Sequence, residues 1–397
     1  MGDDRGFVPE TYAGREQAFI KHELLKRYLE KLFLIIGMST RRLGVKEVCY
    51  VDCFAGPWAD ESEDLAGTSI AISLGILEKC REKLGSLGVR PRFRALYVEQ
   101  NDEAFERLSA FLRGRGSRRV RAAALLGDFV SLREDILHWC GGDAFVFFFV
   151  DPKGWKEVSV GALRPLLTRP RSEFLINFQY DFVNRTVSMA QWKEDMALLL
   201  GEGVAVEGLA PVQRERQLVD TYRRNLARSI PSADTYHARS AYVRVLDPQK
   251  DRPKYHLVYL TSHPRGIIEF MEISETIDLV QKQVRASRKD ETREKKSGIR
   301  DMFGAESLVD VELGHAEPDE VDRFWREYLA NGPRTVGEGQ FADILEQTNW
   351  FPGDLQSSLV RLIDADVLRN LDAPKKRPKK PLHWEKSERL RLVGGAT

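Results

Sequence analysis

An apolar run without alternation is the feature that most constrains the fold of this chain. Residues 145–150 read FVFFFV and lead directly into Asp151. A strand that is apolar on both sides must be buried on both faces, as in the centre of a parallel sheet covered by helices. Similar runs separated by helical patterns surround it, and the strands we expect are residues 48–53, 93–99, 120–126, 145–151 and 173–178. This alternation predicts an α/β fold.

Apolar residues at helical spacing predict the connecting helices. We expect these helices at residues 17–38, 68–84, 102–113, 132–139 and 160–167. Residues 187–228 have helical patterns and no clear strand, which indicates an insertion. Two alternating segments, AYVRVL and YHLVYLT, flank DPQKDRPK and predict an antiparallel hairpin at the end of the sheet.

The length of 397 residues indicates two or three domains. We expect a first domain over residues 1–280, then a helix that runs into a charged linker over 281–317, and a C-terminal domain over 318–397. Within the last domain, helices at 320–330, 339–349 and 353–369 precede a basic turn between two extended pieces. We expect Asp354 to cap the third helix. This layout predicts a winged helix.

Composition excludes several classes of protein. No apolar run approaches the roughly 20 residues of a membrane helix, and the polar N-terminus lacks the pattern of a signal peptide, so we expect a cytoplasmic protein without membrane association. The four cysteines lack the paired spacing of a zinc site, and we expect buried thiols and no metal. A net charge of +1 neither favours nor excludes a nucleic-acid partner.

Carboxylates close or follow four successive predicted strands, at Asp52, Glu99, Asp128 and Asp151. Ligands of an open parallel sheet bind outside the carboxyl ends of its strands, so these side chains mark the predicted site. An acidic residue that closes the second strand commonly accepts hydrogen bonds from both hydroxyls of a ribose. Glu99 therefore predicts a cofactor that contains a ribose.

The loop after the first strand narrows the choice of cofactor. It contains Gly56 but no second glycine before Gly67, and Pro57 and Trp58 stand where a dinucleotide fingerprint would receive a pyrophosphate. A dinucleotide is therefore disfavoured. A cofactor with a ribose and an adenine but no phosphate fits such a loop, and S-adenosylmethionine (SAM) is the common example.

Several motifs carry a family resemblance when they are taken together. IKHELLKRYL, VDCFAGPW, GTSIAISL, LYVEQNDEAFERL, LLGDF, FVDPKGW and LINF occur in this order between about residues 15 and 275. In these motifs the chain resembles the three-Cys-motif partner (TcmP) family, which is similar to class I SAM-dependent methyltransferases. It also resembles the enzymes that methylate the exocyclic amine of adenine in ribosomal RNA. The resemblance implies a Rossmann-like methyltransferase fold, SAM as cofactor and association with a three-Cys-motif protein.

The resemblance also implies which residues hold the cofactor. They lie at strand ends and on the N-terminal helix: Asp52, Phe54, Ala55 and Gly56 at the methionine part of SAM, Lys21 at its carboxylate, Glu99 at the ribose, and Asp128 with Phe129 at the adenine.

The segment after the fourth strand is the predicted catalytic motif. Asp151 and Pro152 match the first half of the Asp/Asn-Pro-Pro-aromatic motif of amino-methyltransferases, in which the acidic side chain and the proline carbonyl accept hydrogen bonds from the target amine. Lys153 replaces the second proline, and the aromatic Trp155 stands one place late. Lys153 would either oppose the positive charge of an attacking amine or bind a phosphate of the substrate. Trp155 would either stack on a base or pack within the protein.

Two further groups are candidates for substrate contact. Asn177 closes the fifth strand and Arg185 follows it, although both also have structural interpretations. Lys376, Arg377 and Lys379 lie in the basic turn, where cations commonly contact the phosphates of DNA or RNA. We expect N-methylation of a nucleic-acid base. The alternatives are a SAM-binding or catalytically silent partner that docks to another protein, and a methyltransferase of a protein or small molecule.

Overall fold

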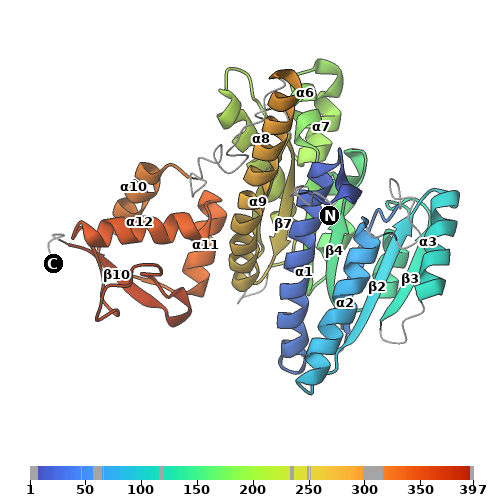
Figure 1. Cartoon of the computed structure of the whole chain (residues 1–397), viewed down its shortest axis with the longest axis horizontal. Helices are drawn as coiled ribbons and strands as arrows, with labels where there is room; N and C mark the ends of the chain where they lie inside the picture. Colours follow the sequence, from blue (N-terminus) through green and yellow to red (C-terminus); the bar gives the residue numbers. More distant parts are fainter. Residues whose placement is uncertain are drawn as a thin grey trace.

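Seven strands form one sheet in the order β3-β2-β1-β4-β5-β7-β6 (Figure 1). The computed structural model describes residues 8–45, 47–56, 65, 67–115, 120–232, 237–247, 250, 252–297 and 316–393. All pairings are parallel except those of β7, which is antiparallel to both β5 and β6. The strands are β1 (Glu47–Asp52), β2 (Arg92–Glu99), β3 (Arg121–Leu126), β4 (Phe145–Val150), β5 (Ser172–Phe178), β6 (Arg239–Leu246) and β7 (Pro253–Thr261). The predicted Rossmann-like sheet with its terminal hairpin is confirmed.

Helices cover both faces of this sheet, as the apolar sequence of β4 requires. One face packs against α1 (Glu16–Leu43), α2 (Ser69–Ser86), α3 (Asp102–Arg115) and α9 (Pro264–Ser297). The other face packs against α4 (Arg133–Cys140), α5 (Val160–Leu167), α6 (Tyr180–Thr186), α7 (Lys193–Leu200) and α8 (Pro211–Arg228). The last two of these, α7 and α8, make up most of the predicted insertion. Among the described residues, no helix has the length and apolar character that crossing a bilayer requires.

The C-terminal unit is α10 (Pro318–Tyr328), α11 (Glu338–Thr348) and α12 (Pro352–Asp364) with a second sheet of β8 (Arg334–Val336), β9 (Leu368–Asn370) and β10 (Glu388–Leu392). This antiparallel sheet has the order β8-β10-β9. The sequence interpretation missed β8, which has three residues, and extended the third helix to residue 369, although 368–370 pair with β10.

Asp354 lies one turn inside α12 and not at its cap. Its carboxylate accepts a hydrogen bond from the Phe351 N–H at 2.8 Å, and Phe351 is the cap residue. The carboxylate still satisfies a free donor at the helix start, so the expected stabilisation is present at a different position from the one predicted.

Helix α9 joins the two units. It continues through residues 281–297, where we expected a helix to run into the charged linker, and it packs against both α1 and α11. Arg288 of α9 forms an ion pair with the buried Glu16 of α1. The remainder of the expected linker, residues 298–315, lies outside the described residues. The division at residue 280 therefore falls inside a helix.

The C-terminal unit covers the free edge of the large sheet. Asn349 ends α11 in a left-handed conformation at φ 55°. Its side-chain amide accepts a hydrogen bond from the Tyr242 N–H and donates one to the Tyr242 carbonyl, both at 3.0 Å. Next to it, Ser240 N–H donates to Glu346 at 2.8 Å, and Arg239 pairs with Asp343 at 2.8 Å. These contacts satisfy backbone groups of β6 that an exposed edge strand would leave open.

We predict that Asn349→Gly lowers the free energy of unfolding by about 1–3 kcal/mol, because the buried N–H and carbonyl of Tyr242 lose their partners. Glycine tolerates the left-handed backbone, so the loss would not come from strain. Urea denaturation measures it, with Gln347→Ala on the exposed side of α11 as control. Equal stability of the two variants would contradict the role given to this amide.

Candidate functional site

A cavity of about 510 Å³ lies at the carboxyl ends of β1, β2, β4 and β5, beside the start of α1. This is the edge at which open parallel sheets bind ligands, and the volume suits a cofactor-sized molecule. Most of the residues that the sequence predicted for this region line it: Lys21, Phe54, Gly56, Glu99, Phe129, Asp151, Pro152, Lys153 and Asn177.

Asp52 supports the cavity from below without lining it. The side chain is fully buried, and its oxygens accept hydrogen bonds from the Ser69 hydroxyl at 2.6 Å, the Phe54 N–H at 3.2 Å and the Tyr50 hydroxyl at 3.3 Å. Burial raises the pKa of Asp52 to about 6. Asp52 therefore fixes the loop after β1, from which Phe54 lines the cavity. Pro57 and Trp58 lie outside the described residues.

Ala55 is also a supporting residue. It is 1% exposed, and its N–H donates to the Val98 carbonyl of β2 at 2.8 Å. This backbone bond holds the loop after β1 against the next strand, so that Gly56 reaches the cavity. Ala55 therefore positions the predicted cofactor loop through its main chain.

Glu99 and Phe129 form the part of the cavity beside β2 and β3. Glu99 is 2% exposed, burial raises its pKa, and one oxygen accepts a hydrogen bond from the Asn101 N–H at 2.7 Å. The rings of Phe54 and Phe129 lie 5.0 Å apart and give an apolar wall near this carboxylate. Asp128 is instead exposed and accepts hydrogen bonds from Ser131 at 2.9 and 3.1 Å. Of the predicted adenine pair, Phe129 faces the cavity and Asp128 does not.

Asp151 contacts two other residues that the sequence predicted for the site, Asn177 and Lys21. One carboxylate oxygen accepts a hydrogen bond from Asn177 Nδ2 at 2.7 Å, and the other forms an ion pair with Lys21 Nζ. The side chains of Lys21 and Asp151 are 13% and 18% exposed. Lys21, which we expected at the carboxylate of the cofactor, therefore lies at the predicted catalytic carboxylate in this structure.

The residues after Asp151 divide between the cavity and the protein interior. The Pro152 carbonyl accepts a hydrogen bond from Gln179 Nε2 at 3.5 Å, and Lys153 is exposed at the cavity. The Trp155 ring stacks on Phe182, with centroids 5.5 Å apart, and does not line the cavity. Of the two interpretations of Trp155, packing within the protein agrees with this geometry.

Arg185 also lies away from the cavity. It is 63% exposed and pairs with Asp181 one turn earlier on α6. The expectation of substrate contact by Arg185 is therefore not supported by its position, because its guanidinium faces solvent and a carboxylate of its own helix.

Sequence reasoning missed the contribution of α1 beyond Lys21. Arg15, Ala18 and His22 are spaced by three and four residues, as on one face of a helix, and all line the cavity. Burial lowers the pKa of His22 to about 3, and its Nδ1 is hydrogen-bonded to the Tyr12 hydroxyl at 3.0 Å. His22 is therefore a neutral imidazole near neutral pH. The helical spacing was a usable signal once the start of this helix was known to face the strand ends.

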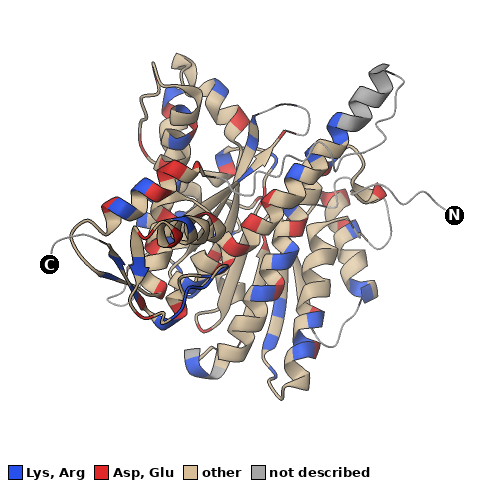
Figure 2. Ribbon diagram, turned by 60° about the vertical axis from the view of Figure 1, so that its left-hand side comes forward, with Lys and Arg blue, Asp and Glu red and all other residues tan. Residues whose placement is uncertain are grey.

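Carboxylates pair with three of the basic side chains in the turn between β9 and β10. The ribbon in Figure 2 is blue at Lys and Arg and red at Asp and Glu. Arg377 binds Glu388 at 2.8 Å, Lys376 pairs with Asp364 at 3.1 Å, and Lys380 pairs with Glu385 at 2.9 Å. Glu388 is only 3% exposed, so Arg377 has a structural role. Lys375 and Lys379 are exposed and form no ion pair within the described part of the chain.

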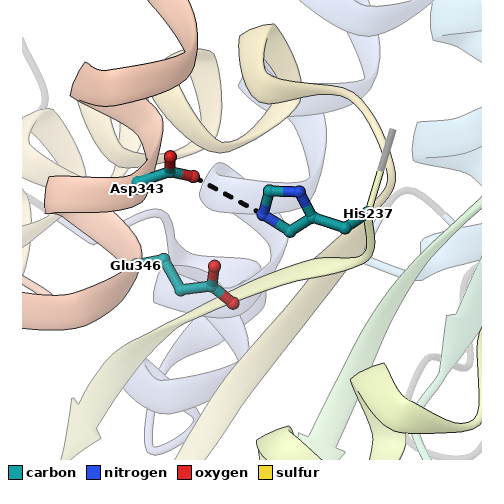
Figure 3. Close-up of side chains that lie close together, drawn as sticks. All are labelled: His237, Asp343 and Glu346. Atoms are coloured by element: carbon teal, nitrogen blue, oxygen red, sulfur yellow. Dashed lines mark ion pairs between the residues drawn. The ribbon is translucent and has the colours of Figure 1, made fainter. Parts of the chain in front are cut away.

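His237, Asp343 and Glu346 form a group with the spacing of metal ligands, away from the cavity (Figure 3). Their ligand atoms lie within 4.8 Å of one another, and His237 is 3.5 Å from Asp343. Arg239 already pairs with Asp343 and would oppose a cation, while Glu346 accepts the Ser240 N–H. These contacts identify the group as part of the joint between β6 and α11.

The four cysteines are buried thiols, as predicted: Cys49, Cys53, Cys80 and Cys140.

No protein-family model matches this chain, and no curated protein matches it. The O-methyltransferase TomG from Streptomyces achromogenes in complex with SAM is similar at 11% identity, over 59% of this chain and 80% of that one, with a TM-score of 0.30. M. jannaschii TYW2 in complex with AdoMet is similar at 12% identity, over 56% and 72%, with a TM-score of 0.27. Aeropyrum pernix fibrillarin with bound S-adenosyl-L-methionine is similar at 14% identity, over 54% and 66%, with a TM-score of 0.28.

These likenesses are too low to carry an argument about the chemistry of this chain. The fold is therefore assigned from the strand order and pairing, and the site from its own geometry.

We predict that Asp52→Asn removes a pH dependence of stability. The folded pKa of about 6 exceeds the ordinary value of 3.8, so the stabilisation present at low pH is lost as pH rises through 6. At about 1.4 kcal/mol per unit, the variant should gain about 3 kcal/mol over the native protein between pH 4 and 7. Denaturation at several pH values measures this difference, with the exposed Asp143→Asn as control. If the difference in stability between the variant and the native protein did not change between pH 4 and 7, the pKa of Asp52 would not be raised by folding.

Proposed function

We propose that this chain is a SAM-dependent methyltransferase that methylates an amine, with Asp151 and Pro152 orienting the acceptor nitrogen. One observation carries the proposal. A single cavity joins the carboxylate that closes β2, the aromatic pair beside it and the carboxylate that follows β4. A cofactor bound at the first two would present its reactive end toward the third.

The donor set of the cavity fits an adenosine cofactor. Glu99 offers a carboxylate to two vicinal hydroxyls, Phe54 and Phe129 offer an apolar surface to a purine, and Gly56 lets the backbone approach closely. Two acceptors at the cavity, Glu157 Oε2 and Asn177 Oδ1, are buried and have no hydrogen-bond partner among the described residues. Unpartnered buried acceptors support a site that a ligand completes. Bound SAM would supply a methyl group already activated by its sulfonium.

Asp151 would act as the acceptor that orients the amine. Its oxygens are held by Asn177 and Lys21, and the amine would take the place of the Lys21 ammonium at Asp151. Released in this way, Lys21 would remain beside the cavity, where a cofactor carboxylate could take it as a partner. The Pro152 carbonyl would accept the second N–H. Fixing the nitrogen in line with the methyl group supplies most of the catalysis in such a reaction.

We propose a nucleic-acid base as the acceptor, in line with the resemblance to the ribosomal RNA adenine methyltransferases. The support is the C-terminal unit, whose three helices and sheet order β8-β10-β9 agree with a winged helix. Lys379 and Lys375, the exposed cations of its basic turn that form no ion pair among the described residues, would contact phosphates. Lys376 and Arg377 would contribute less, because carboxylates already bind them.

A second function, docking to another protein without catalysis, is favoured by one specific observation. The helix that a winged helix places in the major groove corresponds to α12, and here most of α12 is buried against the protein. Its exposed positions are Ser357, Arg361 and Asp364, and Arg361 is bound by Asp322 at 2.6 Å. Such a helix cannot read base edges as it stands. The TcmP assignment remains a prediction that fits this second function.

We predict that Glu99→Gln and Asp151→Asn have different effects. Glu99→Gln should weaken SAM binding by about 10-fold or more, since an amide accepts only one of two ribose hydrogen bonds. Asp151→Asn should retain SAM binding and reduce methyl transfer by about 100-fold. Calorimetry measures binding, and tritium transfer from labelled SAM to total RNA, DNA or protein measures turnover. Tight SAM binding with no transfer by the native chain would favour the docking function.

We predict that nucleic-acid binding, if it uses the basic turn, depends on Lys379. Lys379→Ala should reduce the slope of log affinity against log salt by about 1, as for one lost phosphate contact. Fluorescence anisotropy with labelled single-stranded RNA and duplex DNA measures this slope. Arg113→Ala, an exposed position on α3, is the control. Salt-independent or absent binding would count against a nucleic-acid acceptor.

A further inference from the structure

A second cavity, of about 470 Å³, lies at the opposite edge of the large sheet, where β4 and β5 begin. We call it the basal pocket. It is enclosed by the second half of α1, the end of β7 and the first turn of α9, and Glu338 at the start of α11 also lines it. It is therefore separate from the proposed active site and lies where the two units of the chain meet.

One wall of the basal pocket is apolar. Leu32, Ile35 and Ile36 lie on one face of α1, together with Phe145 at the start of β4. Ile35 and Ile36 are half-buried, so an apolar surface remains open to a ligand. A pocket of this volume with such a wall accommodates the apolar body of a small molecule.

The floor of the pocket is a buried carboxyl group that the proposed reaction does not use. Glu173 is 4% exposed and accepts hydrogen bonds from the hydroxyls of Tyr28 at 2.9 Å, Tyr259 at 2.8 Å and Thr261 at 2.9 Å. Burial raises its pKa. A side chain at Gly266 would meet two of these hydroxyls at 2.6 and 2.8 Å, so glycine keeps this corner open. These three hydrogen bonds hold Glu173 within the protein fold.

The charges at the rim decide which ligand suits the pocket. Glu269 is bound by Arg265 at 2.7 Å and by Lys31 at 3.1 Å, and Glu338 lies 3.9 Å from His263. Arg42 and Arg171 also line the pocket and are exposed. Neither arginine has a carboxylate partner among the described residues. The pocket therefore combines an apolar wall with two uncompensated guanidinium groups.

We infer that the basal pocket binds an amphipathic anion, a carboxylate on a flexible apolar chain. The apolar chain lies against Ile35 and Ile36, and the carboxylate accepts hydrogen bonds from Arg42 and Arg171. Guanidinium groups suit this role because they form paired, charge-assisted hydrogen bonds with carboxylates. Such a ligand contacts both units, since the pocket includes residues of α1 and of α11.

Calorimetry with decanoate and with its uncharged counterpart decanol tests this inference. We expect saturable decanoate binding at one site per chain. The double variant Arg42→Gln and Arg171→Gln should weaken decanoate by about 10-fold and leave decanol unchanged. Ile35→Asp should weaken both. Arg90→Gln, an exposed arginine on the α2–β2 loop, should change neither.

Three outcomes would overturn the inference. One is the absence of saturable decanoate binding by the native chain. Another is equal affinity for decanoate and decanol that does not change in the double arginine variant. The third is loss of decanoate binding in Asp151→Asn, because this would move the ligand to the first cavity. Thermal unfolding of each variant confirms that the protein is folded, and Ile35→Asp tests the same pocket without touching the arginines.

Discussion

The burial of β4 on both faces is the constraint on which the site depends. All six of its residues are buried, with Phe147 in one core and Phe148 in the other. Polar chemistry can therefore begin only where the strand ends. The parallel register pairs Val150 with Ile176, so the next residues along, Asp151 and Asn177, must meet. Their hydrogen bond at 2.7 Å follows from strand pairing before any catalytic argument is made.

The carboxylates at this edge differ in function because their surroundings differ. Asp52 is sealed beneath its loop, satisfied by hydroxyls and a backbone N–H, with a pKa raised to about 6. Glu99 keeps contact with the cavity while a backbone N–H fixes its orientation. Asp151 is balanced by a lysine from a distant helix. Similar residues at similar places on strands thus fix a loop, face the cavity, or pair with a lysine, and in the proposed reaction the last two bind the ligand and orient the amine.

The sequence predicted those features of the fold that depend on local residue patterns. Strands of the large sheet were placed to within one or two residues because unbroken apolar runs leave few alternatives, and Glu99 followed from strand position alone. Side-chain direction was not accessible in this way, so Asp128 was assigned to the adenine although it binds Ser131, and the choice between stacking and packing for Trp155 stayed open until the structure placed it on Phe182. The pairing of Lys21 with Asp151 joins residues 130 positions apart and required the fold.

Side-chain partners in the C-terminal unit were likewise not accessible from the sequence. Its basic turn looked like a free cationic surface because no carboxylate stands next to Lys376 or Arg377 in the sequence. The fold brings Asp364 to Lys376 and Glu388 to Arg377. The burial of the unit's third helix depends on contacts with α9 and α10, which sequence pattern does not reveal.

Helix α9 lies between this unit and α1, in contact with both (Figure 1). The C-terminal unit is thus bound to the sheet by packing, by the amide of Asn349 and by ion pairs. A nucleic acid or protein that bound the C-terminal unit would therefore contact a part of the chain that packs directly on the sheet that forms the cavity. Helix α1 extends this connection, since Lys21 near its start lines the proposed active site and Arg42 near its end lines the basal pocket. The proposed active site and the basal pocket therefore share α1, and a ligand at one end would act on the helix that holds Lys21 against Asp151.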